Sequence, residues 1–140
     1  VQSVGTFYDT ALCFDGTVAN QPTHMTFGFM FNRVLAPSEH IRLNLPRFSR
    51  LGGSGPIATD NADFSAKWDQ AANELTLTAL LTLDRMVQRS VAVEASEGFL
   101  IPIQGIVAND AEFLISSDAV LGVVQLTRVN TVHPVGSLGI

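Results

Sequence analysis

The stretch Met25-Thr26-Phe27-Gly28-Phe29-Met30-Phe31 places a large apolar residue at every second position. In an extended strand, this two-residue period presents three phenylalanines on one face of a sheet. Each phenylalanine side chain that becomes buried contributes on the order of 1.5–3 kcal/mol to folding. We therefore expect this strand to anchor the hydrophobic core.

The same period recurs along the chain on both sides of this stretch. It predicts one strand, or two strands with a break at Asp9, within residues 4–14. It also predicts strands within residues 41–45, 64–68, 74–83, 90–95, 113–116 and 120–129. Residues 69–73 are a short connection that predicts a hairpin. Trp68 shares the apolar face of its strand with Phe64, which favours a place in the core. Short strands at this spacing are typical of an all-β sandwich.

Three segments interrupt the period. Residues 47–63 contain glycine, proline and serine without periodicity, and we expect them to form one long loop. Residues 84–89 are the only stretch that suggests a short helical turn. Residues 98–105 are expected to be extended, and Pro102 confines them to a sheet edge or a crossing loop.

The composition argues against several classes of protein. The chain has 140 residues, enough for one domain, and only 15% of them are charged, against roughly 25% in soluble globular chains. The net charge of −5 argues against nucleic-acid binding, and no apolar run is long enough for membrane insertion. Cys13 is the only cysteine, so no internal disulfide can form, and its apolar neighbours predict a buried side chain.

The arginines are unevenly placed. Four of them fall within 18 residues with a single acidic residue among them, whereas residues 51–118 contain ten acidic residues and three cationic ones. This distribution has two interpretations: ordinary solvated loops, or a module that docks its arginine-rich side on the acidic side of a neighbour. The four arginines that form the candidate interaction surface are Arg33, Arg42, Arg47 and Arg50.

No catalytic, cofactor-binding or metal-binding pattern stands out. His24, His40 and His133 are isolated and lack metal-ligand spacing. Residues 60–63 and 109–112 are oxygen-rich turns, which fit either a calcium site or ordinary turns made by Asp and Asn. Residues 52–55 lack the lysine and the helix of a phosphate-binding loop. We therefore expect no cofactor, no metal ion and no enzymatic activity.

The two ends of the chain resemble each other. Residues 1–7 and 132–138 agree in kind at five of seven positions. This agreement predicts a repeating unit with an offset of 131 residues, in which residues 1–131 form a β-sandwich module and residues 132–140 begin the next module or a linker. On this interpretation, residues 137–140 do not form an inner strand of this domain's own sheet. The matched pairs are Val1 with Val132, Val4 with Val135, Gly5 with Gly136, Thr6 with Ser137, and Phe7 with Leu138.

Two longer segments carry a family resemblance. Residues 35–48 (LAPSEHIRLNLPRF) and 96–109 (SEGFLIPIQGIVAN) resemble segments that recur in very long tandem-repeat surface proteins of algae and other protists. That resemblance implies an immunoglobulin-like antiparallel β-sandwich of about 7–9 strands, located outside the cell or on its surface. It implies no catalytic or binding residues.

The expected function is therefore architectural. We expect a structural repeat module of an extracellular filament or cell-surface coat, with neighbouring copies of the same module as partners. The alternative is an adhesion or carbohydrate-binding module that would use residues 47–63 and the arginines to bind glycans. Neither function involves nucleic acid or membrane insertion.

Overall fold

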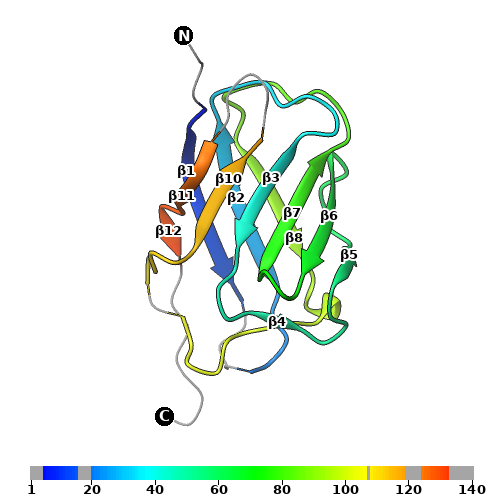
Figure 1. The fold of residues 1–140 in the computed structure, drawn as a ribbon, viewed down its shortest axis with the longest axis vertical. Helices are drawn as coiled ribbons and strands as arrows, with labels where there is room; N and C mark the ends of the chain where they lie inside the picture. Colours follow the sequence, from blue (N-terminus) through cyan, green and yellow to red (C-terminus); the bar gives the residue numbers. More distant parts are fainter. Residues whose placement is uncertain (1–4, 16–19, 107, 119–123, 133–140) are drawn as a thin grey trace.

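Two β-sheets stacked face to face make up the fold (Figure 1), which confirms the predicted all-β sandwich. The computed structural model describes residues 5–15, 20–106, 108–118 and 124–132. One sheet has the strand order β12-β1-β2-β8, the other has the order β11-β10-β3-β7-β6-β5, and β4 pairs with β9 beside them. Eight of the strands in these ranges have four or more residues.

The strand bounds are as follows. The first sheet contains β12 (Thr131–Val132), β1 (Phe7–Phe14), β2 (Met25–Phe31) and β8 (Arg89–Val93). The second contains β11 (Val124–Arg128), β10 (Leu114–Ser117), β3 (His40–Asn44), β7 (Glu74–Ala79), β6 (Phe64–Asp69) and β5 (Gly55–Ile57). The small pair is β4 (Ser49–Arg50) with β9 (Phe99–Leu100), and the 3₁₀ helix η1 (Ala95–Glu97) lies just before β9.

The core lies between the two sheets, and β2 anchors it as predicted. All four alternating apolar residues of β2 are buried. Phe29 meets Phe64 of the opposite sheet edge-on, with ring centroids 6.0 Å apart. Trp68 is fully buried and packs edge-on against Phe99 at 4.9 Å, which confirms its expected place in the core.

The predicted break at Asp9 is a β-bulge in β1. The register with β2 shifts between Tyr8 and Ala11, and Asp9 has a φ of 52°. Within the bulge, the buried Thr10 donates a hydrogen bond from Oγ1 to Asn130 Oδ1 at 2.8 Å and accepts one from the Asn130 N–H at 2.7 Å. The bulge therefore joins β1 to the segment that leads into β12.

The predicted loop at residues 47–63 is wrong in part. It contains two short strands, β4 and β5, which pair with β9 and β6 respectively. The strand predicted over residues 74–83 is also too long, because β7 ends at Ala79 and leaves Leu81 exposed. Cys13, expected to be buried, is half-buried in β1.

The predicted helical turn at residues 84–89 is wrong. Leu83 forms a backbone bridge with Leu35, and Met86 has a φ of 57°, which is incompatible with a right-handed helix. The helical segment of the described chain is η1, which follows β8 directly. Residues 98–105 contain the short strand β9 and then a turn closed by the Gly105 N–H and the Pro102 carbonyl.

The first and last described strands run in the same direction. β12 pairs with β1 in parallel, with Thr131 beside Ala11 and Val132 beside Leu12. In the view of Figure 1, β1 starts at the upper end of the sandwich, and both strands run toward the lower end. Val132 is buried in this domain. Residues 1–4 and 133–140, which carry most of the end-to-start match, lie outside the described residues.

Candidate interaction surfaces

Three of the four predicted arginines form ion pairs within the chain. Arg42 on β3 lies 3.7 Å from Glu74 and 3.8 Å from Asp118. Arg47 lies 2.9 Å from Asp110, and it also donates a hydrogen bond to Glu112. The acidic partners come from β7 and from segments near β10, so these arginines hold distant parts of the chain together.

Arg50 and Arg33 have different surroundings. Arg50 lies 3.5 Å from the Glu97 carboxylate and donates from Nε to the Glu97 carbonyl at 2.7 Å. Arg33 is half-buried, and its Nε is buried with no hydrogen-bond partner in the described structure. The Nε of Arg50 is therefore hydrogen-bonded, whereas the Nε of Arg33 is buried without a partner in the described structure.

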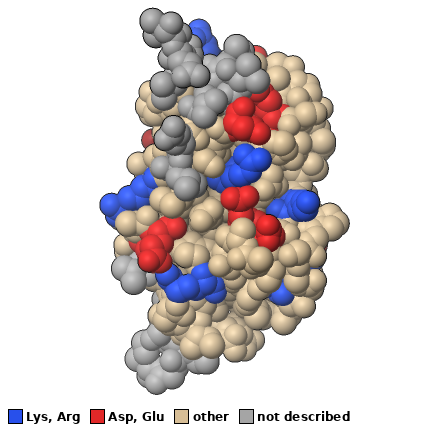
Figure 2. All heavy atoms as spheres, in the orientation of Figure 1, with Lys and Arg blue, Asp and Glu red and all other residues tan. Residues whose placement is uncertain are grey.

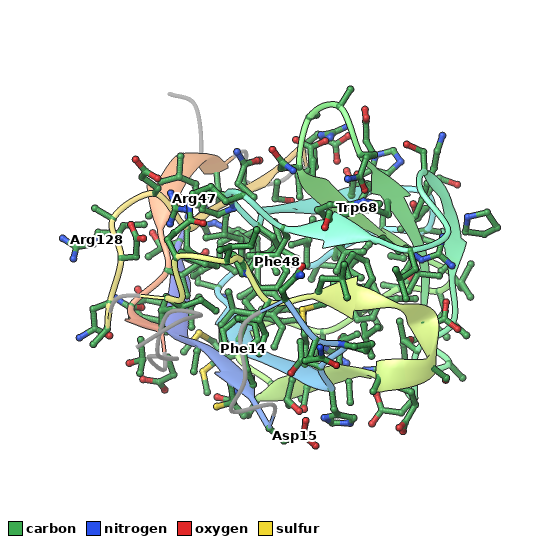
Figure 3. The ribbon with its side chains drawn as sticks, turned by 90° about the horizontal axis from the view of Figure 1, so that it is seen from below. Phe14, Asp15, Arg47, Phe48, Trp68 and Arg128 are labelled. Atoms are coloured by element: carbon green, nitrogen blue, oxygen red, sulfur yellow. The ribbon has the colours of Figure 1, made fainter. Side chains whose placement is uncertain are left out.

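The four arginines do not gather in one patch. Arg33 precedes β3 at the upper end of the sandwich, and Arg42 lies within β3. Arg47 and Arg50 follow β3 at the lower end. In the view from below, Arg47 lies with Arg128 on the side that carries β11, while Phe48 lies between the two sheet layers (Figure 3).

Burial alone lowers the pKa of Arg47. The hydrogen bonds to Glu112 and Asp110 and the charges of these two carboxylates outweigh burial and raise that pKa above its ordinary value.

The structure does gather polar side chains on the outer face of the six-stranded sheet. Residues that alternate with the buried positions of β3, β6 and β7 line a shallow hollow of about 320 Å³ there. Cationic and anionic side chains are interspersed over this side of the molecule (Figure 2). We call this the sheet-face site, and it consists of His40, Arg42, Lys67, Asp69, Glu74, Thr76 and Thr78.

Asp118 orders one side of the sheet-face site. Its Oδ1 accepts the His40 backbone N–H at 2.7 Å, and its Oδ2 lies 2.8 Å from His40 Nδ1. Partial burial alone raises the pKa of Asp118. The hydrogen bonds from the His40 ring and backbone and the charges of His40 and Arg42 outweigh burial and hold that pKa below its ordinary value. The carboxylate therefore stays ionised and keeps His40 and Arg42 in place.

The sheet-face site can offer hydrogen bonds and charges of both signs to a polar partner. Arg42 is the one residue of this site that the sequence analysis places in a candidate interaction surface, whereas His40 was considered only as a metal ligand. The others could have been found from the same alternation that predicts the strands, since polar residues between buried ones share the outer face. The acidic partners of the arginines could not have been found from the sequence, because pairs such as Arg42 and Asp118 lie far apart along the chain.

Side-chain oxygens of the oxygen-rich turns, residues 60–63 and 109–112, accept hydrogen bonds from backbone N–H groups. Asp60 accepts the Ala92 N–H at 2.7 Å, Asp110 accepts the Glu112 N–H at 2.9 Å, and Asn109 accepts the Val132 N–H at 3.0 Å. These carboxylate and amide oxygens serve the turn and edge roles expected of Asp and Asn. Within the described ranges, His, Cys, Asp and Glu form no group of three or more suited to a metal ion.

No family model matches the chain, and no curated protein is similar enough to count as a match. In the part of the chain that the structure covers, no helix has the length and apolarity needed to cross a membrane.

Proposed function

We propose that this chain is a structural repeat module of an extracellular filament or cell-surface coat, which spaces and assembles copies of itself in a linear series. The observation that carries the proposal is the parallel pairing of β1 and β12. Because both strands run from the upper to the lower end, a chain that enters at the upper end leaves β12 toward the lower end. This geometry supports a module joined to its neighbours end to end.

Two features of the sequence support the same proposal. Residues 132–138 repeat the character of residues 1–7, so the chain from the last residue of β12 onward resembles the start of another copy. Residues 35–48 and 96–109 resemble segments of tandem-repeat surface proteins, which favours an immunoglobulin-like version of the sandwich and an extracellular place. The first of these segments contains β3 and the second contains β9.

The sequence of the complete polypeptide and its location test this function. We expect at least one further copy of the unit beside this one, at an offset near 131 residues. Surface biotinylation of intact cells should label the protein without permeabilisation. A single copy in the complete polypeptide, or labelling only after permeabilisation, would contradict the proposal.

The sheet-face site favours adhesion as a second candidate function. Its hydroxyl groups, carboxylates and cations form an open polar hollow of the kind that a glycan could occupy by hydrogen bonding. A glycan array tests this candidate with the wild type and Arg42→Ala. Arg85→Ala is the control, because Arg85 is an exposed arginine in the connection at the upper end. Binding that is lost only in Arg42→Ala supports adhesion, and an array without hits argues against it.

A further inference from the structure

The exposed large apolar side chains of the described residues concentrate at the two ends of the sandwich. Seven such side chains are at least 43% exposed, and six of them lie in connections at the ends. The seventh, Tyr8, lies on β1. We call four of the six the upper patch (Leu80, Leu81, Met86 and Val87) and two the lower patch (Leu51 and Ile103).

The upper patch lies on the connection from β7 to β8, which crosses the end where β1 begins (Figure 1). Its side chains are 56%, 46%, 51% and 43% exposed, in chain order. The connection is fixed to the sandwich at two points within the patch. Leu83 forms two backbone hydrogen bonds with Leu35, of 2.8 and 3.0 Å, and the Met86 N–H donates to the Phe31 carbonyl at 2.7 Å. These apolar side chains are therefore held outward by an anchored backbone.

The lower patch lies at the opposite end of the sandwich, the end toward which β12 runs. Leu51 is 71% exposed and Ile103 is 58% exposed. The Leu51 N–H donates to the Gly98 carbonyl at 2.9 Å. Gly98 has a φ of 87°, and a Cβ at this position would lie 3.2 Å from Leu51 Cβ, so a larger residue here would strain the backbone and press on Leu51. The hydrogen bond to Gly98 therefore holds Leu51 in place.

We propose that the lower patch of one copy packs against the upper patch of the next copy, and that this head-to-tail contact sets the geometry of the series. The inference rests on the proposed function and on its repeat register. In that register Leu138 takes the place of Phe7, and Leu138 lies only six residues after Val132. Six residues span at most about 20 Å, so β1 of the next copy starts close to the lower end of this one.

Each patch is therefore covered by the opposite patch of a neighbouring copy. Exposed apolar groups gain by leaving water together. A contact between two different surfaces of the same molecule is heterologous and continues from copy to copy without closing into a dimer. A short connection between copies also holds the two patches at an effective concentration in the millimolar range, so a weak contact is sufficient.

Mixing two blocked variants of the chain tests the contact. One variant carries Leu81→Ser and Met86→Ser in the upper patch, and the other carries Leu51→Ser and Ile103→Ser in the lower patch. Each is examined alone and as an equimolar mixture by sedimentation velocity, up to about 1 mM, the concentration that a short linker imposes. We expect each variant alone to be monomeric, the mixture to form 1:1 dimers, and the wild type to form longer assemblies.

The matched control is Lys67→Ser, which removes an exposed long side chain from the middle of β6, away from both ends of the sandwich. It should assemble like the wild type, and circular dichroism should show that all variants keep the β-fold. Dimers of either variant alone, or a mixture that stays monomeric, would overturn the head-to-tail contact. That result would leave the proposed function standing if the complete polypeptide contains adjacent copies, so the two failures are distinguishable.

Discussion

At the scale of single residues, Gln70 accepts hydrogen bonds from two donors beside the core. Its Oε1 lies 2.6 Å from the indole nitrogen of Trp68 and 3.1 Å from the Arg50 backbone nitrogen. Replacing Gln70 with leucine leaves both donors without this acceptor, and we expect the free energy of unfolding to fall by about 1–3 kcal/mol. Denaturant unfolding followed by the fluorescence of Trp68, the only tryptophan, measures this loss.

The control for this prediction is Gln104→Leu, which makes the same exchange at an exposed glutamine in the turn after β9. It should change the free energy of unfolding by less than about 0.5 kcal/mol, as exposed substitutions usually do. Equal effects of the two substitutions would show that the hydrogen bonds of Gln70 do not stabilise the fold.

Asp118 makes stability depend on pH. Its pKa is lower in the folded chain, so the stabilisation is present above the unfolded value of about 3.9 and is lost as the pH falls through the folded value. The side chain is 43% exposed, and solvent screening limits the effect to less than about 1 kcal/mol. The wild type should therefore be more stable than Asp118→Asn at pH 6, and the difference should shrink by about pH 2.5. Urea unfolding at the two pH values measures it, and a constant difference would contradict the assignment.

At the scale of elements, Asp60 and Asn61 protect the outer edge of β8. The Asp60 carboxylate accepts the Ala92 N–H at 2.7 Å, the Asp60 N–H donates to the Ala92 carbonyl at 3.1 Å, and Asn61 donates to the Ser90 carbonyl at 3.0 Å. An uncovered strand edge can pair with another chain. Residues 60 and 61 therefore oppose side-by-side association of the four-stranded sheets.

The substitution Asp60→Ala should weaken this protection. We expect the free energy of unfolding to fall by about 0.5–1.5 kcal/mol and the Ala92 amide to exchange faster with solvent. Hydrogen exchange followed by NMR measures both changes at the edge. Asp84→Ala is the control, since Asp84 is exposed and, among the described residues, it accepts a hydrogen bond from Arg89 through its backbone carbonyl and not its carboxylate. Unchanged exchange at Ala92 would contradict the role of Asp60.

The long strands could be predicted from the sequence because a two-residue period over five or more residues is unambiguous, as in β2 and β6. The two short strands β4 and β5 have two and three residues and contain Arg50, Gly55 and Pro56, so they carry no period of their own. Leu81 continues the pattern of β7, but the strand has ended, and no local signal marks that end. β4 and β5 form because they pair with β9 and β6 in the folded chain.

The candidate surfaces were less predictable than the strands. The cluster of arginines was visible, but the acids that pair with it lie far along the chain, and only the folded sheets bring Arg47 to Asp110. The two apolar patches at the ends depend on where connections cross the sandwich. Ile103, for example, follows an apolar run that suggests burial, yet it lies in an exposed turn.

At the scale of the whole molecule, the salt dependence of assembly separates two kinds of contact. Docking through Arg33, Arg42, Arg47 and Arg50 would weaken as salt rises from about 0.05 to 0.5 M, where the screening length falls well under 10 Å. Apolar contact between the patches would persist. Because three of these arginines already pair with acids of their own chain, we expect less than about a threefold change in the dissociation constant of the mixed dimers. Sedimentation velocity at the two salt concentrations measures it, and a tenfold weakening would indicate ionic docking.

The parallel pairing of β1 and β12 also determines how the module carries tension. A pull on the two ends of the chain acts on the start of β1 and on the finish of β12, and it drags the two strands past each other along their length. Their shared hydrogen bonds and those between Thr10 and Asn130 are then loaded together. A hairpin such as β6 and β7, pulled at its two open ends, would instead lose its hydrogen bonds one after another. In a series of such modules, stretching is therefore resisted by shear within each copy.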